Sequence, residues 1–340
     1  MAYTERVDIA IIGGGPAGIF AGALLGTIYS VAIVERRSRE FVKPCGGLCT
    51  RRALQYLSPF EPPEWIYATP KSSAIHLVDL ENREEEAVKQ ETYNIRRGHL
   101  ERWLRSLLSR QSIFYEHTIV QSIRSKGGGY ELLLSHDHGG RSVLRASVVL
   151  GADGVRSETR ALLGLPPANS VQTVQYRVNN YAELDHIEFL FDSTITGDFY
   201  IWVIPKDETL LIGTRHDLEH REAFEELIAR RYDISLPKAI DKREGYPLTR
   251  VSSVDEICWG RERILLLGEA AGLVMPAFGE GLTSAFESAY MASMAIRRSF
   301  ADPLPEYEKE GQQILARIDR ETSIFPLMGN ALTRHLVFKL

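Results

Sequence analysis

Two cysteines and two glycines lie close together in residues 42–50, VKPCGGLCT. Cys45 directly precedes Gly46 and Gly47, and Cys49 follows shortly after. Glycine lets a backbone approach a ligand closely, and a neutral thiol beside it can donate a proton or control access. A Cys45–Cys49 disulfide also fits this spacing. No metal site is expected, because the chain has neither a second cysteine pair nor a histidine cluster.

A second group of informative residues lies near the N-terminus, in VDIAIIGGGPAGIFAGALLGTIYSVAIVERR. Gly13, Gly15 and Gly18 form the pattern G-x-G-x-x-G between a predicted strand and a predicted helix, and a second predicted strand ends at Glu35. The glycines allow a tight turn, close approach to a pyrophosphate and close helix packing, and the acid accepts hydrogen bonds from a ribose. The segment therefore predicts a dinucleotide site.

Two further glycine-rich strand ends occur far downstream. The first, VVLGADGVRSETR, ends a predicted strand at residues 151–154. The second, RILLLGEAAGLVMPAFGEGLTSAFESAYMASMAI, ends a strand at Gly268 and Glu269 and continues through a loop into a long helix. After Arg37 no regular alternation of strands and helices follows, unlike in a Rossmann dehydrogenase. The apolar strands predict a buried parallel sheet.

The composition limits the classes of protein to consider. The chain has 340 residues, a formal charge of −5, a pI near 6.0 and three cysteines. The length suggests two domains, and the lack of basic excess argues against nucleic-acid binding. An odd number of irregularly spaced cysteines favours a reducing, cytoplasmic location. Residues 9–34 carry no charge, but glycines and a proline interrupt them, so a buried strand, turn and helix fits better than a membrane span or signal peptide.

Together, the three glycine motifs resemble the three fingerprints of the FAD-dependent oxidoreductases built like para-hydroxybenzoate hydroxylase. The resemblance spans roughly residues 5–300 and implies FAD, rather than free NAD, as the cofactor. It also implies an α/β fold, in which a Rossmann-like FAD-binding domain is interleaved with a smaller, mostly antiparallel β-sheet substrate domain.

The resemblance assigns cofactor-binding residues. RRGHLERWL matches the R-x-x-[FL]-[DE]-x-x-L helix of these enzymes, so Arg97 is expected to reach the FAD, and Val120 is expected to contact adenine through its backbone. Glu269 departs from the usual Asp, and its extra methylene moves the charge outward. The expected FAD-binding residues are Gly13, Gly15, Ala17, Gly18, Glu35, Arg36, Cys45, Gly46, Gly47, Arg97, Val120, Asp153, Gly268, Glu269, Gly279, Gly281 and Leu282.

Between the second and third motifs the sequence changes to alternating, aromatic-rich segments. QTVQYRV, HIEFLF, DFYIWVI and TLLIGT predict one mostly antiparallel sheet. Alternation divides one of these strands into two faces. The faces are formed by Tyr200, Trp202 and Ile204 on one side and by Phe199, Ile201 and Val203 on the other. Such a sheet over a flavin forms an apolar roof for a substrate.

Two short segments resemble the geranylgeranyl reductase family. YIWVIPK is similar to its Y-x-W-x-F-P-K signature, with Ile204 in place of Phe, and KPCGG resembles its cysteine-glycine motif. The resemblance implies that Cys45 lies near flavin N5 and the substrate alkene. Tyr200 and Trp202 are expected to line the same space, although both also fit a role in the sheet core. The expected catalytic residues are thus Cys45, Tyr200 and Trp202, and Lys206 is expected to be a turn residue.

The motifs predict an FAD-dependent oxidoreductase that reduces carbon–carbon double bonds of a prenyl, geranylgeranyl-like chain or another apolar substrate by hydride transfer from reduced flavin. Two alternatives stay open. YIWVIP is one substitution from the W-x-W-x-I-P motif of flavin-dependent halogenases, which fits a monooxygenase or halogenase that uses a flavin peroxide. The other alternative is a flavin-binding assembly factor whose active site has drifted.

Domain boundaries follow from the interleaved motifs. The expected FAD-binding domain comprises residues 1–70, 96–170 and 245–305, the substrate domain residues 71–95 and 171–244, and a C-terminal helical segment residues 306–340. The end of that segment is apolar with basic residues, which suits a buried closing helix or peripheral contact with a membrane or partner. No separate nicotinamide domain is visible, so the expected electron donor is transiently bound NAD(P)H or a ferredoxin-like protein.

Overall fold

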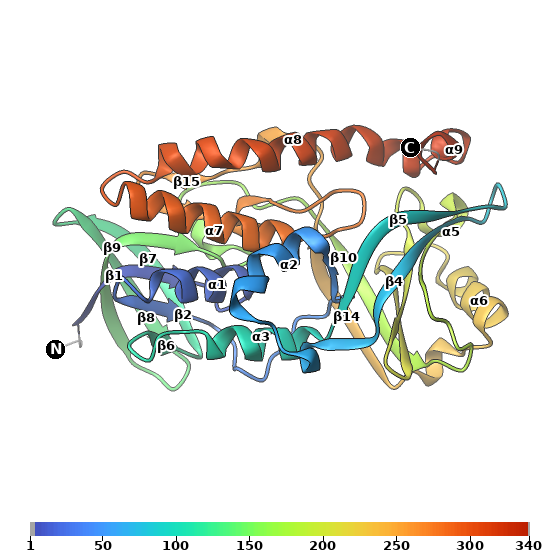
Figure 1. Cartoon of the computed structure of the whole chain (residues 1–340), viewed down its shortest axis with the longest axis horizontal. Helices are drawn as coiled ribbons and strands as arrows, with labels where there is room; N and C mark the ends of the chain where they lie inside the picture. Colours follow the sequence, from blue (N-terminus) through green and yellow to red (C-terminus); the bar gives the residue numbers. More distant parts are fainter. Residues whose placement is uncertain (1–3, 339–340) are drawn as a thin grey trace.

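Two eight-stranded sheets, each with its own apolar core, form the two halves of the chain in a computed structural model that describes residues 4–338, apart from the side chains of residues 89 and 90 (Figure 1). The chain crosses between the halves several times. The expected α/β fold with a nucleotide-binding domain and a second sheet domain is therefore confirmed.

The first sheet carries the nucleotide-binding frame. Its main path runs in the order β15-β16-β9-β1-β2-β6, and the pairs from β16 to β6 are parallel. A hairpin of β7 and β8 continues the sheet antiparallel to β9. The strands are β1 (Thr4–Ile12), β2 (Val31–Val34), β6 (Ile113–Tyr115), β7 (Thr118–Lys126), β8 (Gly129–His136), β9 (Arg141–Gly151), β15 (Gly260–Arg261) and β16 (Ile264–Leu266). The parallel order brings the carboxyl ends of β1, β9 and β16 to one edge.

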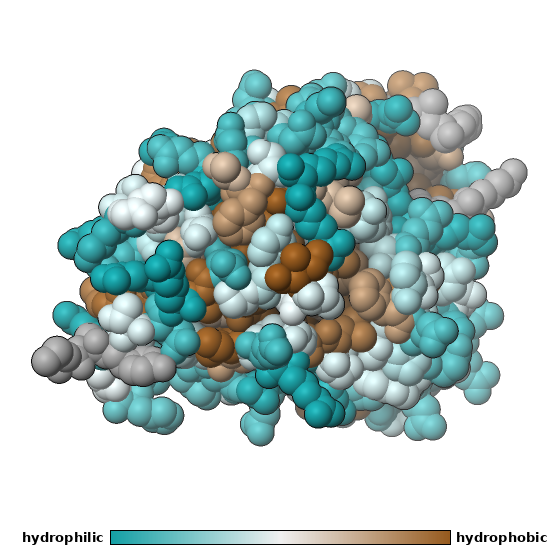
Figure 2. All heavy atoms as spheres, turned by 60° about the vertical axis from the view of Figure 1, so that its left-hand side comes forward, coloured by the Kyte–Doolittle hydropathy of each residue, from teal (hydrophilic) through white to brown (hydrophobic). Residues whose placement is uncertain are grey.

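Helices cover this first sheet (Figure 1). The buried helix α1 begins at Pro16, whose fixed φ suits the first turn of a helix, and it packs against α7. The helices of this half are α1 (Pro16–Leu25), α2 (Arg51–Leu57), α3 (Arg97–Ser106), α4 (Glu158–Leu162) and α7 (Leu282–Arg298). Short 3-10 turns are η1 (Ser58–Phe60), η2 (Glu64–Ile66), η4 (Val254–Glu256) and η5 (Gly268–Ala271). On the outer face of this half, apolar side chains reach the surface in patches between polar ones (Figure 2).

The second sheet has the order β14-β10-β13-β12-β11-β4-β5-β3 and is antiparallel except for the pair β11 and β4. Its strands are β3 (Leu48–Thr50), β4 (Tyr67–Asp79), β5 (Glu84–Ile95), β10 (Ser170–Asn179), β11 (Ile187–Phe191), β12 (Ile201–Lys206), β13 (Thr209–Arg215) and β14 (Asp241–Thr249). The four predicted aromatic-rich segments thus form one mostly antiparallel sheet, as expected. Strand β3 also joins it, although its residues fall in the expected FAD-binding segment.

The two faces of β12 pack against different partners. Ile201 and Val203 belong to the outer core under α6 (Arg221–Tyr232), whereas Tyr200 and Ile204 belong to the inner core. The expected position of Phe199 on the outer face is wrong. Phe199 precedes the start of β12, so strand alternation does not reach it, and its ring stacks on Tyr200 with centroids 4.5 Å apart.

The C-terminal helices connect the two cores. Helix α8 (Leu304–Met328) packs Ile314 into the core of the first sheet and Phe325 into that of the second, and α9 (Ala331–Phe338) lies over the second sheet (Figure 1). The remaining short helices are α5 (Ser193–Thr196) and η3 (Leu236–Lys238). In residues 4–338, no helix combines the length and the apolar character needed to cross a bilayer.

Candidate active site

A cavity of about 750 Å³ lies between the two sheets and takes its lining from both. It reaches from the glycine turn after β1 to the aromatic face of β12. Of the residues predicted to bind the cofactor or take part in catalysis, every one except Gly18 lines this cavity. The structure thus brings together segments that are up to about 270 positions apart in the sequence.

The glycine turn has the geometry that a dinucleotide requires. Gly13 has φ +106°, and a Cβ there would lie 2.3 Å from the carbonyl oxygen of Ala152. A Cβ on Gly18 would lie 2.0 Å from the Gly13 carbonyl oxygen, so Gly18 serves helix packing and has no place in the lining. A Cβ on Gly15 would meet no atom within 4 Å, because Gly15 faces the open cleft. This division of roles fits a pyrophosphate held at the N-terminus of α1.

Glu35 is held in position before any ligand binds. Its carboxylate accepts hydrogen bonds from the Gly14 N–H at 2.6 Å and from the Arg37 N–H at 2.9 Å. Beside it, Arg36 forms an ion pair of 3.3 Å with Glu158. The acid therefore lies at the end of β2, where an adenosine ribose would need an acceptor.

The second wall of the cleft is built by the turn after β9. Asp153 accepts hydrogen bonds from the Ser157 hydroxyl at 2.6 Å and from the Thr159 N–H at 2.9 Å. Burial raises the pKa of Asp153, and these hydrogen bonds oppose the shift. Its carboxylate thus orders the first turn of α4, and Gly154 and Val120 also line the cleft.

Glu269 is paired across the cleft with a lysine that the sequence analysis missed. Lys43, two residues before Cys45, forms an ion pair with Glu269 Oε2, and the Thr249 hydroxyl donates to Glu269 Oε1 at 3.5 Å. The pair joins the loop after β2 to η5. The extra methylene of Glu269 lets its charge reach this loop.

Cys45 lies where the cofactor half meets the second sheet. Its Sγ accepts a hydrogen bond from the Gly47 N–H at 3.3 Å and lies 3.7 Å from Arg97 Nη1. Arg97 also donates to Glu101 at 2.7 Å. A Cβ on Gly46 would lie 2.5 Å from Ile204 Cδ1, so this glycine lets the cysteine loop pack directly against β12.

The cysteines form no disulfide. Cys45, Cys49 and Cys258 are all free thiols, and burial raises the pKa of Cys49, which keeps it neutral. Among residues 4–338, no group of His, Cys, Asp or Glu side chains is suited to hold a metal ion. A thiol role for Cys45 is therefore compatible with the geometry, whereas the disulfide left open by the sequence is not formed.

Lys206 is not the turn residue that the sequence suggested. It ends strand β12, and its Nζ donates a hydrogen bond of 2.8 Å to the Ile95 carbonyl. Burial lowers the pKa of Lys206 to about 8, against the charges of Cys45 and Asp207. The ammonium group thus lies behind the cysteine loop, close to Gly47.

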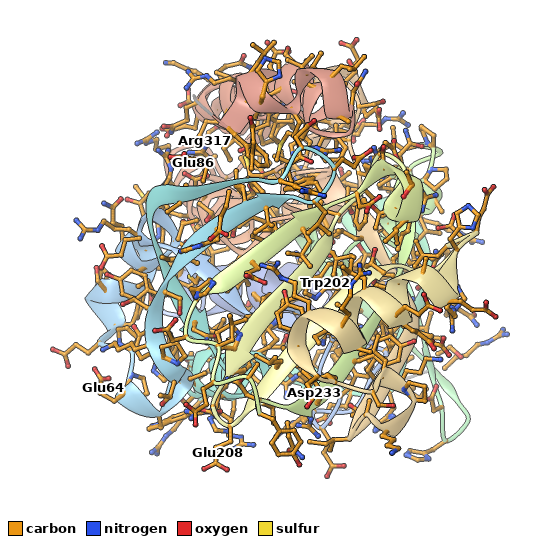
Figure 3. All side chains as sticks on the ribbon, turned by 90° about the vertical axis from the view of Figure 1, so that its right-hand side faces the viewer. Glu64, Glu86, Trp202, Glu208, Asp233 and Arg317 are labelled. Atoms are coloured by element: carbon orange, nitrogen blue, oxygen red, sulfur yellow. The ribbon has the colours of Figure 1, made fainter. Side chains whose placement is uncertain are left out.

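Aromatic side chains line the end of the cavity that faces the second sheet. The Tyr200 ring lies 5.3 Å from Phe189, 6.2 Å from Trp202 and 6.3 Å from Phe278, measured between centroids. Figure 3 shows Trp202 on the sheet behind α6. Burial raises the pKa of Tyr200, so its phenol stays neutral. We call this part of the cavity, lined by these four residues, the aromatic chamber.

The acidic residues that line the cavity include Glu280 and Glu321, which the sequence analysis missed. Glu280 lies between the glycines of the third motif, and Glu321 on α8 accepts a hydrogen bond of 3.2 Å from the Ala277 N–H. The spacing of the buried residues in α8 could have identified Glu321 from the sequence. The buried residues of α8 are Tyr307, Gly311, Ile314, Ile318, Phe325 and Met328, and Glu321 occupies the position that continues this three-and-four spacing.

The glycine turn, the acid at the end of β2 and the third glycine-rich wall together fit a fold that binds flavin adenine dinucleotide. The chain belongs to the FAD binding domain family, whose model matches residues 6–317. FAD is therefore the cofactor, and the protein is of the FAD-dependent oxidoreductase class.

Individual relatives agree with this assignment. The chain is similar to Protein CbrA of Escherichia coli O1:K1, with 26% identity over 314 residues, which cover 89% of this chain and 83% of that protein. Among solved structures, it resembles a geranylgeranyl bacteriochlorophyll reductase-like protein from Thermoplasma acidophilum, with TM-score 0.82, 19% identity and coverage of 99% and 90% of the two chains. It also resembles PqsL of Pseudomonas aeruginosa, a probable FAD-dependent monooxygenase, with TM-score 0.73, 17% identity and coverage of 99% and 100%.

Proposed function

We propose that the protein reduces carbon–carbon double bonds of a prenyl, geranylgeranyl-like chain or a similarly apolar substrate. The observation that carries this proposal is the direct packing of the Cys45–Gly46 loop against Ile204, beside the aromatic chamber and inside the cofactor cavity. An isolated alkene offers little charge to bind, so an apolar chamber that orients it and excludes water is the main catalytic device that it needs. The likeness to a protein described as geranylgeranyl bacteriochlorophyll reductase-like supports the same substrate class.

The residues of this chain would divide the work as follows. Gly13, Gly15 and Glu35 hold the dinucleotide end of FAD, and bound FAD in its reduced form supplies the hydride. Tyr200 and Trp202 orient the apolar chain. Cys45 limits access to the reacting atoms. The electron donor proposed is NAD(P)H or a ferredoxin-like protein, and a cytoplasmic location with peripheral membrane contact remains part of the proposal.

An oxygen-using flavoenzyme is the second candidate. The segment YIWVIP, which differs from the halogenase motif at one position, and the likeness to the probable monooxygenase PqsL support it. Both candidates use the same cofactor cleft and differ in what oxidises the reduced flavin: an alkene in the first case and dioxygen in the second.

Anaerobic reoxidation separates the two. The purified protein with bound FAD is reduced with dithionite, freed of excess reductant, mixed with geranylgeranyl lipid and then exposed to oxygen. We expect the flavin absorbance to return on addition of the lipid, with one double bond reduced for each flavin that is reoxidised. Reoxidation by oxygen alone would contradict the reductase. The same assay with NAD(P)H or reduced ferredoxin in place of dithionite identifies the donor.

The Cys45→Ala variant tests the cysteine loop. We expect slower reoxidation by lipid, by at least about tenfold, with the FAD content unchanged, because the thiol contacts the reacting space while the glycine turn holds the cofactor. Cys258→Ala is the matched control, since Cys258 does not line the cavity. Equal rates for Cys45→Ala and the wild type would remove the thiol from the reaction.

A further inference from the structure

The carboxylate of Glu280 lies in the wall of the cleft, and none of the described side chains forms an ion pair with it. Glu280 stands between Gly279 and Gly281 before α7, and its Oε1 accepts a hydrogen bond of 2.8 Å from the Thr283 N–H. The Met275 N–H donates to the Glu280 carbonyl at 2.9 Å, which fixes the backbone. Among the described side chains of residues 4–338, which leave out those of residues 89 and 90, no lysine, arginine or histidine pairs with Glu280. The side chain is therefore held in place, but its charge is not neutralised.

The charges nearest to Glu280 are also carboxylates. Glu321 reaches the same cleft from α8. Glu287 lies two turns along α7, where Arg52 and Arg317 form ion pairs with it. Arg317 also acts on Glu321, but its guanidinium is bonded to Glu287. Burial also raises the pKa of Glu321, so Glu321 adds to the repulsion of Glu280 only when it is ionised, and the repulsion from Glu287 is the larger of the two.

The other surroundings favour the neutral acid. The Cys49 thiol faces Glu280 from β3 and is itself kept neutral by burial. Phe278 of the aromatic chamber precedes Glu280 by two residues in the same loop, and Phe278, Glu280 and Glu321 all line the cavity. Burial, and then repulsion by Glu287 and Glu321, raise the pKa of Glu280 to about 7, although the Thr283 N–H opposes this shift. An acid in this range is suited to proton transfer near neutral pH.

We propose that Glu280 is the acid that protonates the substrate in the aromatic chamber, and that Glu321, which reaches the same cleft from α8, is a positioning residue for it. This inference rests on the proposed function, and it assigns the proton to Glu280 instead of to Cys45. Glu280 lies in the cavity wall between the two glycines expected at the flavin, whereas Cys45 belongs to the loop that follows β2.

The proposed step is balanced. One alkene carbon forms a C–H bond with a hydride that comes from reduced FAD, and the other forms a C–H bond with the proton of Glu280. The alkene is reduced, the flavin is oxidised, and Glu280 is left as a carboxylate that takes its next proton from water. The two electrons are restored by the external reductant, which is dithionite in the assay above.

The first test uses the protein without substrate. Because the pKa of Glu280 is higher in the folded protein than in the unfolded chain, ionisation destabilises the fold, and this cost appears as the pH rises from about 4.5 to about 7. The variant Glu280→Gln keeps an acceptor for the Thr283 N–H and cannot ionise. We expect its melting temperature to equal that of the wild type at pH 4.5 and to exceed it at pH 8. A difference that does not change with pH would overturn the proposal.

The second test measures reoxidation of reduced enzyme by prenyl lipid as a function of pH. We expect the wild-type rate to fall as the pH rises through about 7, and Glu280→Gln to be slower by a factor of about 10² to 10⁴ without this fall. Glu321→Gln removes the repelling charge, so its rate is expected to fall at a lower pH than that of the wild type. Glu64→Gln, at an exposed site, is the control for substitution alone.

The outcomes distinguish the two proposals. If the wild type reduces the lipid and Glu280→Gln does so at the same rate and with the same pH profile, Glu280 is not the acid and the reductase stands. If the wild type does not reduce the lipid, the reductase is overturned, and with it the role of Glu280.

Discussion

Burial of the Lys206 side chain disfavours its charged form. The pKa is lowered to about 8, below the ordinary value of 10.5, so the charged form is disfavoured in the folded protein. This cost is fully present below pH 8 and disappears as the pH rises to about 10.5, and it is of order 3 kcal/mol at most. We predict that the wild type gains stability relative to Lys206→Met between pH 8 and pH 10.5, as measured by urea unfolding.

The matched control for this prediction is Lys71→Met, because Lys71 is half-exposed. Its stability difference from the wild type should not change over the same range. If the free energies of unfolding of Lys206→Met and the wild type changed in parallel with pH, burial would not destabilise the charged ammonium group, and the prediction would be wrong. The hydrogen bond to Ile95 is lost in the variant at every pH. Its loss therefore lowers the free energy of unfolding by the same amount at each pH and does not change the pH dependence.

For single residues, the sequence predicted which residues line the cavity better than it predicted which residues contact one another. Most of the residues expected to bind FAD were chosen because they lie at fixed places in glycine motifs, and all except Gly18 line one cavity. Their binding role stays a prediction. Lys43 and Glu269 were not paired, because they are far apart in the sequence and no local pattern links them. Lys206 was interpreted from the sequence as a turn residue. Its burial results from contact with Gly47 of the cysteine loop, and this contact cannot be read from the sequence.

The turn between β1 and α1 allows two similar substitutions with different results. An added methyl at Gly15 meets no atom within 4 Å, and the backbone there has φ −80°, which alanine adopts readily. We predict that Gly15→Ala folds with wild-type stability but binds FAD at least about tenfold more weakly, because the methyl projects into the cleft. FAD fluorescence titration and thermal unfolding of the FAD-free protein measure the two effects separately.

Gly18→Ala provides the contrast within the same turn. Its added methyl would lie 2.0 Å from the Gly13 carbonyl oxygen, so the helix must move away from the strand. We expect a loss of stability of about 3 kcal/mol, the upper range for overpacking. A stable Gly18→Ala, or an unstable Gly15→Ala, would reverse the assignment of packing and binding roles.

The loop after β2 and the turn η5 are coupled by the ion pair of Lys43 and Glu269. Because both side chains are largely buried at the cleft, we predict that Lys43→Met and Glu269→Gln each weaken FAD binding, and that the double variant is weakened by less than the sum. A coupling energy of about 1 kcal/mol or more in this cycle would show the interaction. The exposed pair of Lys71 and Glu64 serves as the control cycle, with no expected coupling to FAD binding.

At the scale of elements, the hydrophobic patterns were sufficient for both sheets. Alternation predicted the faces of β12 where the strand is regular, and it failed at Phe199, where the strand has not begun. The position of β3 was not evident, because three residues carry too little pattern to show that they pair with β5. The spacing of buried residues in α8 places Glu321 on its buried face. Only the structure shows that Glu321 accepts a hydrogen bond from Ala277 in the 275–281 loop.

The two halves of the molecule are joined by the C-terminal helices, and Arg334 anchors the last of them. It is buried on α9 and donates to Asp79 at 2.6 Å and to Glu81 at 3.1 Å. We predict that Arg334→Met costs about 3 to 5 kcal/mol in the free energy of unfolding, because it leaves Asp79 buried without its partner. Arg298→Met, at a half-exposed ion pair, is the control and should cost less than about 1 kcal/mol.

The cavity takes one wall from residue 13 and another from residue 281. The ribosome makes the first wall about 270 residues before the second. A nascent chain that has not yet reached residue 281 therefore contains the turn expected to cradle the diphosphate but lacks the wall formed by the 275–281 loop. The cavity can enclose its cofactor only after that loop has been made.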